Sequence, residues 1–381
     1  MYKYYLIGLL FSIGLILPQP SAAAKNWTQT NESGFGDVSN TAATFFKIYG
    51  NLYAVTDNVE GVQAYHYDSA DEVWEEVAAW GFLNDSNNVA VSANLKIRGN
   101  AVFLAFSNEV TGAQVWQVEH NGSQAADLVA TQVNYSGFGN SGYQSVLHLL
   151  KFDNRILAYV QNSGDGKVRV LRSPIDSSKS YEYMSWEFMT DLDADFFEGL
   201  DAAVVFEDVV YIANGDPASV YTSTDGKNYT YSETYAEYAR AYNTSQISFL
   251  QVADSGDRLF VGDTTSRRFC YEVRHELSYT FNGSNWSLDT NRPNKSFCYT
   301  HMVPKPHSSA VYVLGFDEKD GVVYKIHGIW IQQTADGFVG NNRDGIESSN
   351  NRQFSDGIWY RGDIFLATQN TTDGTQIWTK Q

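Results

Sequence analysis

Positive charge is scarce in this sequence, and long apolar runs and familiar catalytic motifs are missing. Lys and Arg total 26 against 44 Asp and Glu, so the formal net charge is −18. This balance excludes a general nucleic-acid binder, because contacts with phosphates need clustered basic side chains. The partners that suit such a chain are cations, basic protein surfaces and neutral sugars.

The apolar run near the N-terminus is too short to cross a bilayer. It extends from Leu6 to Leu17, about 12 residues, whereas a membrane-spanning helix needs about 20. One Lys precedes the run and the small residues Ser21–Ala24 follow it, which is the order of a secretory signal peptide. We therefore expect residues 1–24 to be a cleaved signal and the remaining chain to be secreted, without membrane insertion.

Motifs that mark common active sites are also absent. The sequence has no Gly-x-Ser-x-Gly elbow, no His-Glu-x-x-His pair and no Gly-rich nucleotide-binding motif. Pairs of Asp and Glu that could hydrolyse a glycoside are too numerous to indicate a site. The sequence therefore predicts no catalytic residue and no required cofactor.

What the sequence does contain is a short apolar strand that recurs after a tight turn. Aromatic residues make up 15% of the chain, and abundant Gly, Asn, Ser and Thr favour strands joined by turns. Gly-Asn, Gly-Asp and Asp-Asn pairs precede several copies and suit hairpins with positive φ. Seven copies follow one another at a spacing of roughly 50 residues: GNLYAVT, NAVFLAFS, NRILAYVQ, DVVYIAN, DRLFVGD, SAVYVLG and GDIFLATQ.

Each copy belongs to a repeat of four antiparallel strands, which predicts an all-β, seven-bladed β-propeller over residues 25–381. The last repeat ends after its third strand, whereas the mature N-terminus begins with a fourth strand. Pairing residues 27–30 with the last repeat would close the ring and remove exposed sheet edges. The predicted fourth strands often begin with an aromatic residue: Trp74, Trp186, Tyr229, Trp286 and Trp330.

Two repeated motifs resemble a known family. The first motif appears as WTQTNESGFGD, WEEVAAWGFLND and TQVNYSGFGN, and the second as GNLYAVTDNVEGVQ and GDIFLATQNTTDGTQIW. Together they look like the secreted propellers with Asp-box-type repeats of the sialidase-like superfamily. The Asp-box itself appears only in degenerate form, as STDGKNY at Ser223–Tyr229. The resemblance is structural and implies little about chemistry.

The resemblance also implies an alternative function, a divergent sialidase-like glycoside hydrolase. Such a site needs converging arginines for the substrate carboxylate and a Tyr/Glu nucleophilic pair. Several arginines fall in first-to-second strand turns, on the face away from the usual pocket: Arg98, Arg155, Arg258 and Arg361. Those expected near the pocket mouth are Arg267, Arg268, Arg343 and Arg352.

Acidic residues concentrate in the loops expected on the mouth side of the propeller. These loops join second to third strands and fourth to first strands. Either Asp simply makes good turns there, or the loops bind a cation or a basic partner. On the second interpretation the candidate binding residues are Asp37, Asp57, Glu60, Asp85, Asp165, Arg267, Arg268, Asp317, Asp320, Asp344 and Asp373.

One acidic segment alternates in a way that could present several oxygens to one Ca²⁺. Its candidate ligands are Asp191, Asp193, Asp195 and Glu198. The helical calcium-loop pattern needs Gly at its sixth position, where this segment has Phe196. A calcium site and a solvated acidic loop both remain open.

The two cysteines, Cys270 and Cys298, are expected to form a disulfide in an exported chain. Free thiols, and a zinc site with His275 and His301, are the alternatives. Asn-x-Ser/Thr triplets suggest surface glycans, although turn composition alone also brings these residues together. The triplets begin at Asn26, Asn31, Asn84, Asn121, Asn134, Asn228, Asn243, Asn282, Asn285, Asn294 and Asn370.

Aromatic residues in the Gly-Phe motifs could either stack on sugars or wedge between blades. They are Phe35, Phe82, Phe138 and Phe338, with Trp80, Tyr135 and Tyr143 nearby. Taken together, the sequence predicts a monomeric, exported propeller that binds a glycan or an extracellular protein through its acidic loop face.

Overall fold

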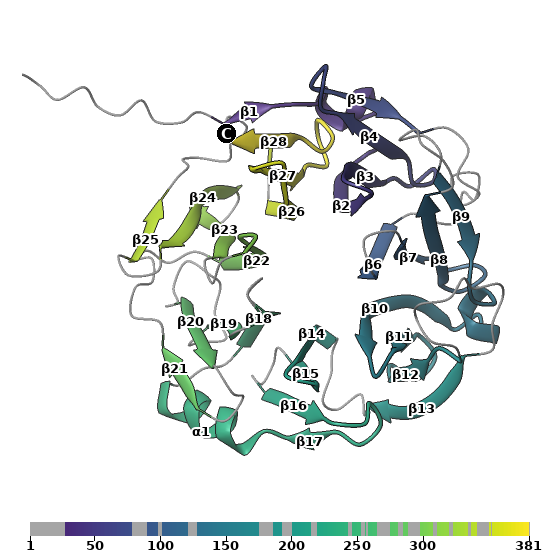
Figure 1. The fold of residues 1–381 in the computed structure, drawn as a ribbon, viewed down its shortest axis with the longest axis vertical. Coiled ribbons are helices and arrows are strands. Elements are labelled where there is room, and N and C mark those ends of the chain that lie inside the picture. Colours follow the sequence, from purple (N-terminus) through teal and green to yellow (C-terminus); the bar gives the residue numbers. More distant parts are fainter. Residues whose placement is uncertain are drawn as a thin grey trace, which may run out of the picture.

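The computed structural model describes residues 27–77, 90–97, 101–120, 128–174, 186–192, 200–214, 219–242, 246–252, 256, 258–264, 275–280, 285–288, 298–307, 311–319, 323–333, 337–340, 350–351 and 353–380. Within these ranges the chain forms antiparallel sheets of four strands each, which stand one after another around a common centre (Figure 1). This is the arrangement of a β-propeller. The described residues include a single α-helix, α1 (Glu233–Tyr242). No helix among them is long and apolar enough to cross a membrane.

We number the sheets by their order along the chain. Sheet 1 contains β2 (Ala42–Ile48), β3 (Asn51–Asp57), β4 (Ala64–Asp68) and β5 (Val73–Glu76); sheet 2 contains β6 (Ala90–Ile97), β7 (Ala101–Ser107), β8 (Gln114–His120) and β9 (Leu128–Gln132). Sheet 3 contains β10 (Tyr143–Phe152), β11 (Arg155–Asn162), β12 (Val168–Arg172) and β13 (Glu187–Leu192); sheet 4 contains β14 (Leu200–Phe206), β15 (Val209–Asn214), β16 (Ser219–Ser223) and β17 (Thr230–Tyr231).

The remaining sheets follow the same pattern, except that the last one takes its fourth strand from the N-terminus. Sheet 5 contains β18 (Gln246–Val252), β19 (Leu259–Thr264), β20 (His275–Thr280) and β21 (Trp286–Leu288); sheet 6 contains β22 (Cys298–Pro304), β23 (Val311–Lys319), β24 (Val323–Gln333) and β25 (Gly337–Gly340). Sheet 7 contains β26 (Gln353–Tyr360), β27 (Asp363–Gln369), β28 (Ile377–Lys380) and β1 (Thr28–Gln29).

The repeated apolar strand of the sequence is the second strand of each sheet. In β3, β7 and β27, five consecutive residues are buried. A strand is buried on both faces when neighbouring sheets pack against it from both sides, and it then loses the apolar–polar alternation of a half-exposed strand. The copies recur because every sheet has such a central strand.

Tight hairpins join the first and second strands, as the sequence predicts. Both central residues have positive φ in the turns at Tyr49-Gly50, Asp153-Asn154, Glu207-Asp208 and Arg361-Gly362. This is the type I′ geometry, whose twist matches that of the flanking strands. The predicted pair is confirmed at Asp153-Asn154, whereas the turns at Gly50 and Gly362 begin one residue earlier than predicted, because Asn51 and Asp363 already belong to β3 and β27.

The hydrophobic core lies between consecutive sheets rather than at one centre. Between sheets 7 and 1, for example, Phe45 and Leu52 pack in one cluster with Phe365 and Ile377, all at most 3% exposed. Similar clusters join sheets 1 and 2, 2 and 3, 3 and 4, 4 and 5, and 6 and 7. The first strand β26 contacts both β22 and β2, and β18 contacts β22.

Strand β1 pairs with β28 at the far end of the sequence. Thr28 lies opposite Thr379 and Gln29 opposite Trp378, and the Thr30 amide donates to the Ile377 carbonyl at 2.8 Å. Trp27 is buried in the same apolar cluster as Trp378. The first described residues thus complete the sheet that the last ones begin (Figure 1).

Two sequence-based placements are wrong. Trp330 lies in β24, the third strand of sheet 6, because that strand extends to Gln333. Asp317 lies in β23 opposite Lys325, and not in a loop, because β23 extends to Lys319.

Burial also decides between the two explanations of the Asn-x-Ser/Thr triplets at two sites. The side chains of Asn134 and Asn370 are fully buried. Asn134 donates to the Ala113 carbonyl at 3.1 Å, and Asn370 donates to the Asn351 side-chain oxygen at 3.0 Å. These two asparagines stabilise loops and cannot carry a surface glycan.

Candidate functional site

Two of the acidic loop residues, Asp37 and Asp373, accept hydrogen bonds within the protein. Asp37 accepts hydrogen bonds from the Ser39 amide at 2.9 Å and from the Asn58 side chain at 2.9 Å. The bond from the Ser39 amide lowers the pKa of Asp37 most, although partial burial opposes it. Asp373 accepts from the side chain of Asn350 at 2.8 Å. These carboxylates fasten turns, which is the role that turn composition alone predicts.

Two further carboxylates join the inner strands of neighbouring sheets. Asp57 accepts from the Val91 amide at 3.1 Å, and burial raises its pKa to about 6. Asp356, which the sequence did not single out, accepts from the Phe45 amide at 2.7 Å. Burial raises the pKa of Asp356 to about 7. Asp57 therefore links sheet 1 to sheet 2, and Asp356 links sheet 7 to sheet 1.

One of the four candidate calcium ligands, Asp191, lies in β13 and contacts a basic side chain. Asp191 forms an ion pair with Arg169 at 2.6 Å, and Arg169 also pairs with Asp165 at 2.6 Å. One guanidinium thus neutralises part of the charge that Asp191 and Asp165 would offer to a cation. The other three proposed ligands, Asp193, Asp195 and Glu198, lie outside the described residues. No cluster of three or more His, Cys, Asp or Glu side chains that could hold a metal occurs in the described part of the chain.

Among the remaining candidate binding residues, Glu60 is described and the others lie outside the described residues. Glu60 is exposed in the loop after β3, as expected. Cys270 lies outside the described residues, so its pairing with Cys298 remains a prediction. The same holds for Asp85, Arg267, Arg268, Asp320, Arg343, Arg352 and Asp344, and thus for the mouth-side arginine cluster.

The aromatic residues of the Gly-Phe motifs pack within the protein where they are described. Phe35 stacks on Tyr65 with ring centroids 3.9 Å apart, and Phe138 meets Trp186 edge-on at 5.2 Å. This supports the wedge interpretation for both. Phe82 and Trp80 lie outside the described residues, and Phe338 lies in β25.

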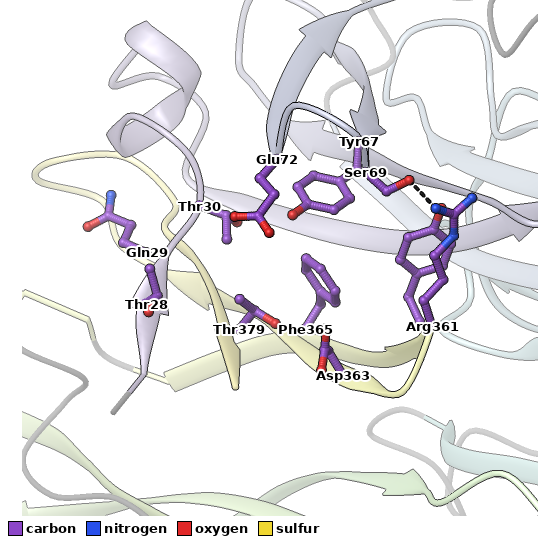
Figure 2. A pocket seen from close by; sticks show the side chains of 11 residues that line it. Thr28, Gln29, Thr30, Tyr67, Ser69, Glu72, Arg361, Asp363, Phe365 and Thr379 are labelled. Atoms are coloured by element: carbon purple, nitrogen blue, oxygen red, sulfur yellow. Dashed lines mark hydrogen bonds between the residues drawn. The ribbon is translucent and has the colours of Figure 1, made fainter. Parts of the chain in front are cut away.

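A groove of about 650 Å³ lies where sheets 7 and 1 meet, and we call it the seam groove. It is formed by β1, by the end of β4 with the turn to β5, by the β26–β27 hairpin with its strands, and by β28 (Figure 2). Its lining residues are Thr28, Gln29, Thr30, Tyr67, Ser69, Glu72, Tyr360, Arg361, Asp363, Phe365 and Thr379.

Packed aromatic residues form the floor of the seam groove. Tyr67 meets Phe365 edge-on at 5.0 Å and lies 5.1 Å from Trp74, between ring centroids. The Trp74 indole N–H donates to the Thr30 hydroxyl at 3.1 Å, which fixes β1 against sheet 1. The floor is rigid because each ring contacts several others.

Polar and charged side chains line the groove above this floor. Arg361 donates to the Ser69 hydroxyl, which links the hairpin of sheet 7 to sheet 1 (Figure 2). Burial raises the pKa of Tyr67, and the nearby Glu72 and Asp363 carboxylates raise it further. The groove thus combines an aromatic floor with hydroxyl, amide, carboxylate and guanidinium groups.

The sequence analysis missed this groove and placed Arg361 on the face away from the pocket. Its residues come from both ends of the chain, so no local motif marks them. One signal was available, since Arg361 occupies a type I′ position that Asn, Asp or Gly usually fills. Tyr49 and Glu207 occupy the same position in their own turns, so this signal alone does not single out the groove.

Comparison with known proteins supports the fold and leaves the activity open. No protein-family model matches the chain, and no curated protein matches it either. A GH74 enzyme of Niastella koreensis is similar with a TM-score of 0.56 and 11% identity over 91% of this chain, which spans only 53% of that enzyme. Hydrazine synthase of Kuenenia stuttgartiensis is similar with a TM-score of 0.56 and 10% identity, over 89% of this chain and 95% of that one. At such low identity the likeness shows a shared fold alone.

Proposed function

We propose that this protein is an exported, monomeric, seven-bladed propeller that binds a glycan in the seam groove. Sheets 1–7 are the blades, and the pairing of β1 with β28 closes the ring. Seven sheets among the described residues and the contacts of β26 with both β22 and β2 support this architecture. The N-terminal 24 residues serve as the export signal.

The observation that carries the function is the composition of the seam groove. Its volume of about 650 Å³ lies within the usual range for ligand pockets, roughly 300–1,000 Å³. Tyr67 and Phe365, which are only 6% and 2% exposed, form the packed apolar floor beneath the ligand. Thr28, Gln29 and Glu72 offer donors and acceptors for its hydroxyls.

The groove supports binding better than the acidic loop face does. Asp37, Asp57 and Asp373 already accept hydrogen bonds within the protein, and Asp165 is paired with Arg169. A ligand on that face would have to compete with these contacts.

A glycan array probed with residues 25–381, with and without a chelator, tests the proposal. Array hits are then titrated against Glu72→Gln and Glu75→Gln. Both residues are exposed and three positions apart, but only Glu72 lines the groove. We expect Glu72→Gln to weaken binding by about tenfold or more, the value of a charge-assisted hydrogen bond, and Glu75→Gln to leave it unchanged.

Two results would contradict the proposal. An array without hits would exclude a glycan and leave a protein partner as the alternative. Equal affinities for wild type and both variants would exclude the seam groove as the place of binding. Loss of binding in the chelator would instead point to the acidic segment at residues 191–198.

A further inference from the structure

A second cleft of about 350 Å³ adjoins the seam groove and shares two residues with it, Tyr360 and Arg361. We call it the basic cleft. It is lined by Lys47, Lys305, Pro306, Trp359, Tyr360, Arg361 and Gly362.

The charge of this cleft is opposite to that of the whole protein. Acidic residues outnumber basic ones by 44 to 26 in the sequence, yet the lining contains three cations and no carboxylate. Three sheets each supply one cation: Lys47 comes from β2 of sheet 1, Lys305 follows β22 of sheet 6, and Arg361 lies in the β26–β27 hairpin of sheet 7. The three cations come together only when sheets 1, 6 and 7 are assembled.

Contacts hold two of the cations at the cleft. The Lys47 ammonium donates to the Trp359 carbonyl at 2.6 Å, which anchors it to the cleft wall. The Arg361 guanidinium lies 5.3 Å from the centroid of the Tyr360 ring and donates to Ser69. A guanidinium has five N–H donors, so Arg361 retains donors for a further acceptor. Among the described residues, neither Lys305 nor Arg361 forms an ion pair.

Arg361 also occupies its position against the local backbone preference. Its φ is +51° and that of Gly362 is +98°. The left-handed region is unfavourable for a residue with a long side chain, whereas Asn enters it readily. The Asn-Gly pair would suit this turn better than Arg-Gly does.

We propose that the basic cleft binds the anionic group of an acidic saccharide, a carboxylate or a sulfate ester, while neighbouring sugar units occupy the seam groove. This rests on the proposed glycan binding and specifies its ligand class. Arg361 stands at the junction, where its fork of donors suits the paired oxygens of either anion. Lys47 and Lys305 add charge from opposite sides, and Trp359 and Tyr360 add apolar walls.

The test compares three probes of equal length: a galacturonic acid trimer, a sulfated galactose trimer and a neutral galactose trimer. Each is titrated by calorimetry against wild type, Arg361→Asn and Lys305→Gln. Lys227→Gln is the control, because Lys227 is exposed in the β16–β17 turn on the opposite side of the ring (Figure 1). Thermal unfolding checks the fold of each variant, and Arg361→Asn should be at least as stable as wild type.

We expect the charged trimers to bind more tightly than the neutral one. Lys305→Gln should weaken the charged trimers by about tenfold and leave the neutral trimer within a factor of about two, because Lys305 lines the basic cleft alone. Arg361→Asn should also weaken the charged trimers by about tenfold, at a residue that lines both cavities. Lys227→Gln should change nothing. The stronger of the two charged probes identifies the anion as carboxylate or sulfate.

The outcomes separate this inference from the proposed function. If the neutral trimer binds as tightly as the charged ones and the variants have no effect, anion binding in the basic cleft is contradicted, whereas the proposed glycan binding is not. Glu72→Gln is titrated alongside, because Glu72 lines the seam groove alone. If the charged trimers lose affinity with Lys305→Gln but not with Glu72→Gln, binding in the basic cleft is supported and binding in the seam groove is contradicted. If no saccharide binds, both proposals fail.

Discussion

At the scale of single residues, Tyr360 is the side chain on which the two cavities meet, and its hydroxyl is buried. That hydroxyl has no hydrogen-bond partner among the described residues. The Tyr159 hydroxyl is also buried, but it lies 2.8 Å from the hydroxyl of Tyr229. A buried polar group without a partner lowers stability by roughly 1–3 kcal/mol, whereas a paired one raises it modestly. The hydroxyl of Tyr360 therefore lowers the stability of the fold, whereas that of Tyr159 raises it.

Replacing these tyrosines by Phe should therefore shift stability in opposite directions. Tyr360→Phe removes an unpaired hydroxyl and should stabilise the fold by about 1 kcal/mol. Tyr159→Phe removes a paired one and should destabilise it by a similar amount. Urea unfolding of both variants measures the two free energies. Destabilisation by Tyr360→Phe would mean that its hydroxyl has a partner in the folded protein.

The same scale shows where sequence reasoning stops. Turn chemistry placed Asp37, Asp57 and Asp373 in or beside the correct loops, because Asp favours such positions wherever a strand ends. It could not tell that their oxygens are already bonded, since the donors Asn58, Val91 and Asn350 lie in other segments. Whether a carboxylate can bind a ligand depends on these distant partners.

At the scale of elements, two close contacts between glycines each fix a loop between second and third strands to a Gly-Phe-Gly turn. A Cβ added to Gly112 would lie 2.4 Å from the Cα of Gly137, and one added to Gly374 would lie 2.6 Å from the Cα of Gly34. In both places the two loops also exchange backbone hydrogen bonds, such as Gly137 to Ala113 at 2.9 Å. The Gly-Phe-Gly and Gly-x-Gln motifs recur in the sequence because they form the two halves of this contact.

Gly112→Ala should destabilise the protein far more than Gly139→Ala. Both glycines have φ near +90°, so Ala is strained at either position. Only Gly112 faces another backbone, however, since nothing lies within 4 Å of a Cβ at Gly139. We expect a loss of roughly 1 kcal/mol for Gly139→Ala and at least twice that for Gly112→Ala, where backbone must shift. Equal melting temperatures for the two variants would show that the loops separate without cost.

Asp356 links strands β26 and β2 and should make stability depend on pH. Its pKa is raised from about 3.9 in an unfolded chain to about 7, so folding favours the protonated form. That contribution is complete below the unfolded value and is lost as the pH rises through the folded value. The melting temperature should therefore fall between about pH 4 and about pH 7. Asp356→Asn carries no charge at any pH and should flatten this fall, leaving the smaller contribution of Asp57. An unchanged slope would contradict burial as its cause.

At the scale of the whole molecule, the sequence predicted the repeating sheets and the partner of the N-terminal strand. Periodicity carried that information, because every repeat must present the same buried second strand to its neighbours. The seam groove was not predictable in this way. It arises only where β1, from one end of the chain, joins β27 and β28, from the other, and both meet the turn after β4. Repeats in the sequence predict the same junction between every two neighbouring sheets. The junction of sheets 7 and 1 differs from the others in the residues that meet there.

The pairing of β1 with β28 should then control stability and ligand binding together. Thr30 donates to Ile377, and the donors along an antiparallel edge alternate, so the Thr28 amide faces β28 while the Gln29 amide faces away. Thr28→Pro removes a backbone N–H that faces β28 and thus a hydrogen bond of the sheet. Gln29→Pro removes an N–H that faces away from β28, a position where an edge strand tolerates proline. We expect Thr28→Pro to lower the melting temperature by several degrees, the effect of about 1–2 kcal/mol, and to weaken saccharide binding, because β1 forms one wall of the groove. Gln29→Pro should have a smaller effect on the melting temperature. If both variants unfold at the wild-type temperature, β1 contributes nothing to holding sheets 7 and 1 together. A closed ring would then depend on the packing of Phe45, Phe365 and their neighbours alone.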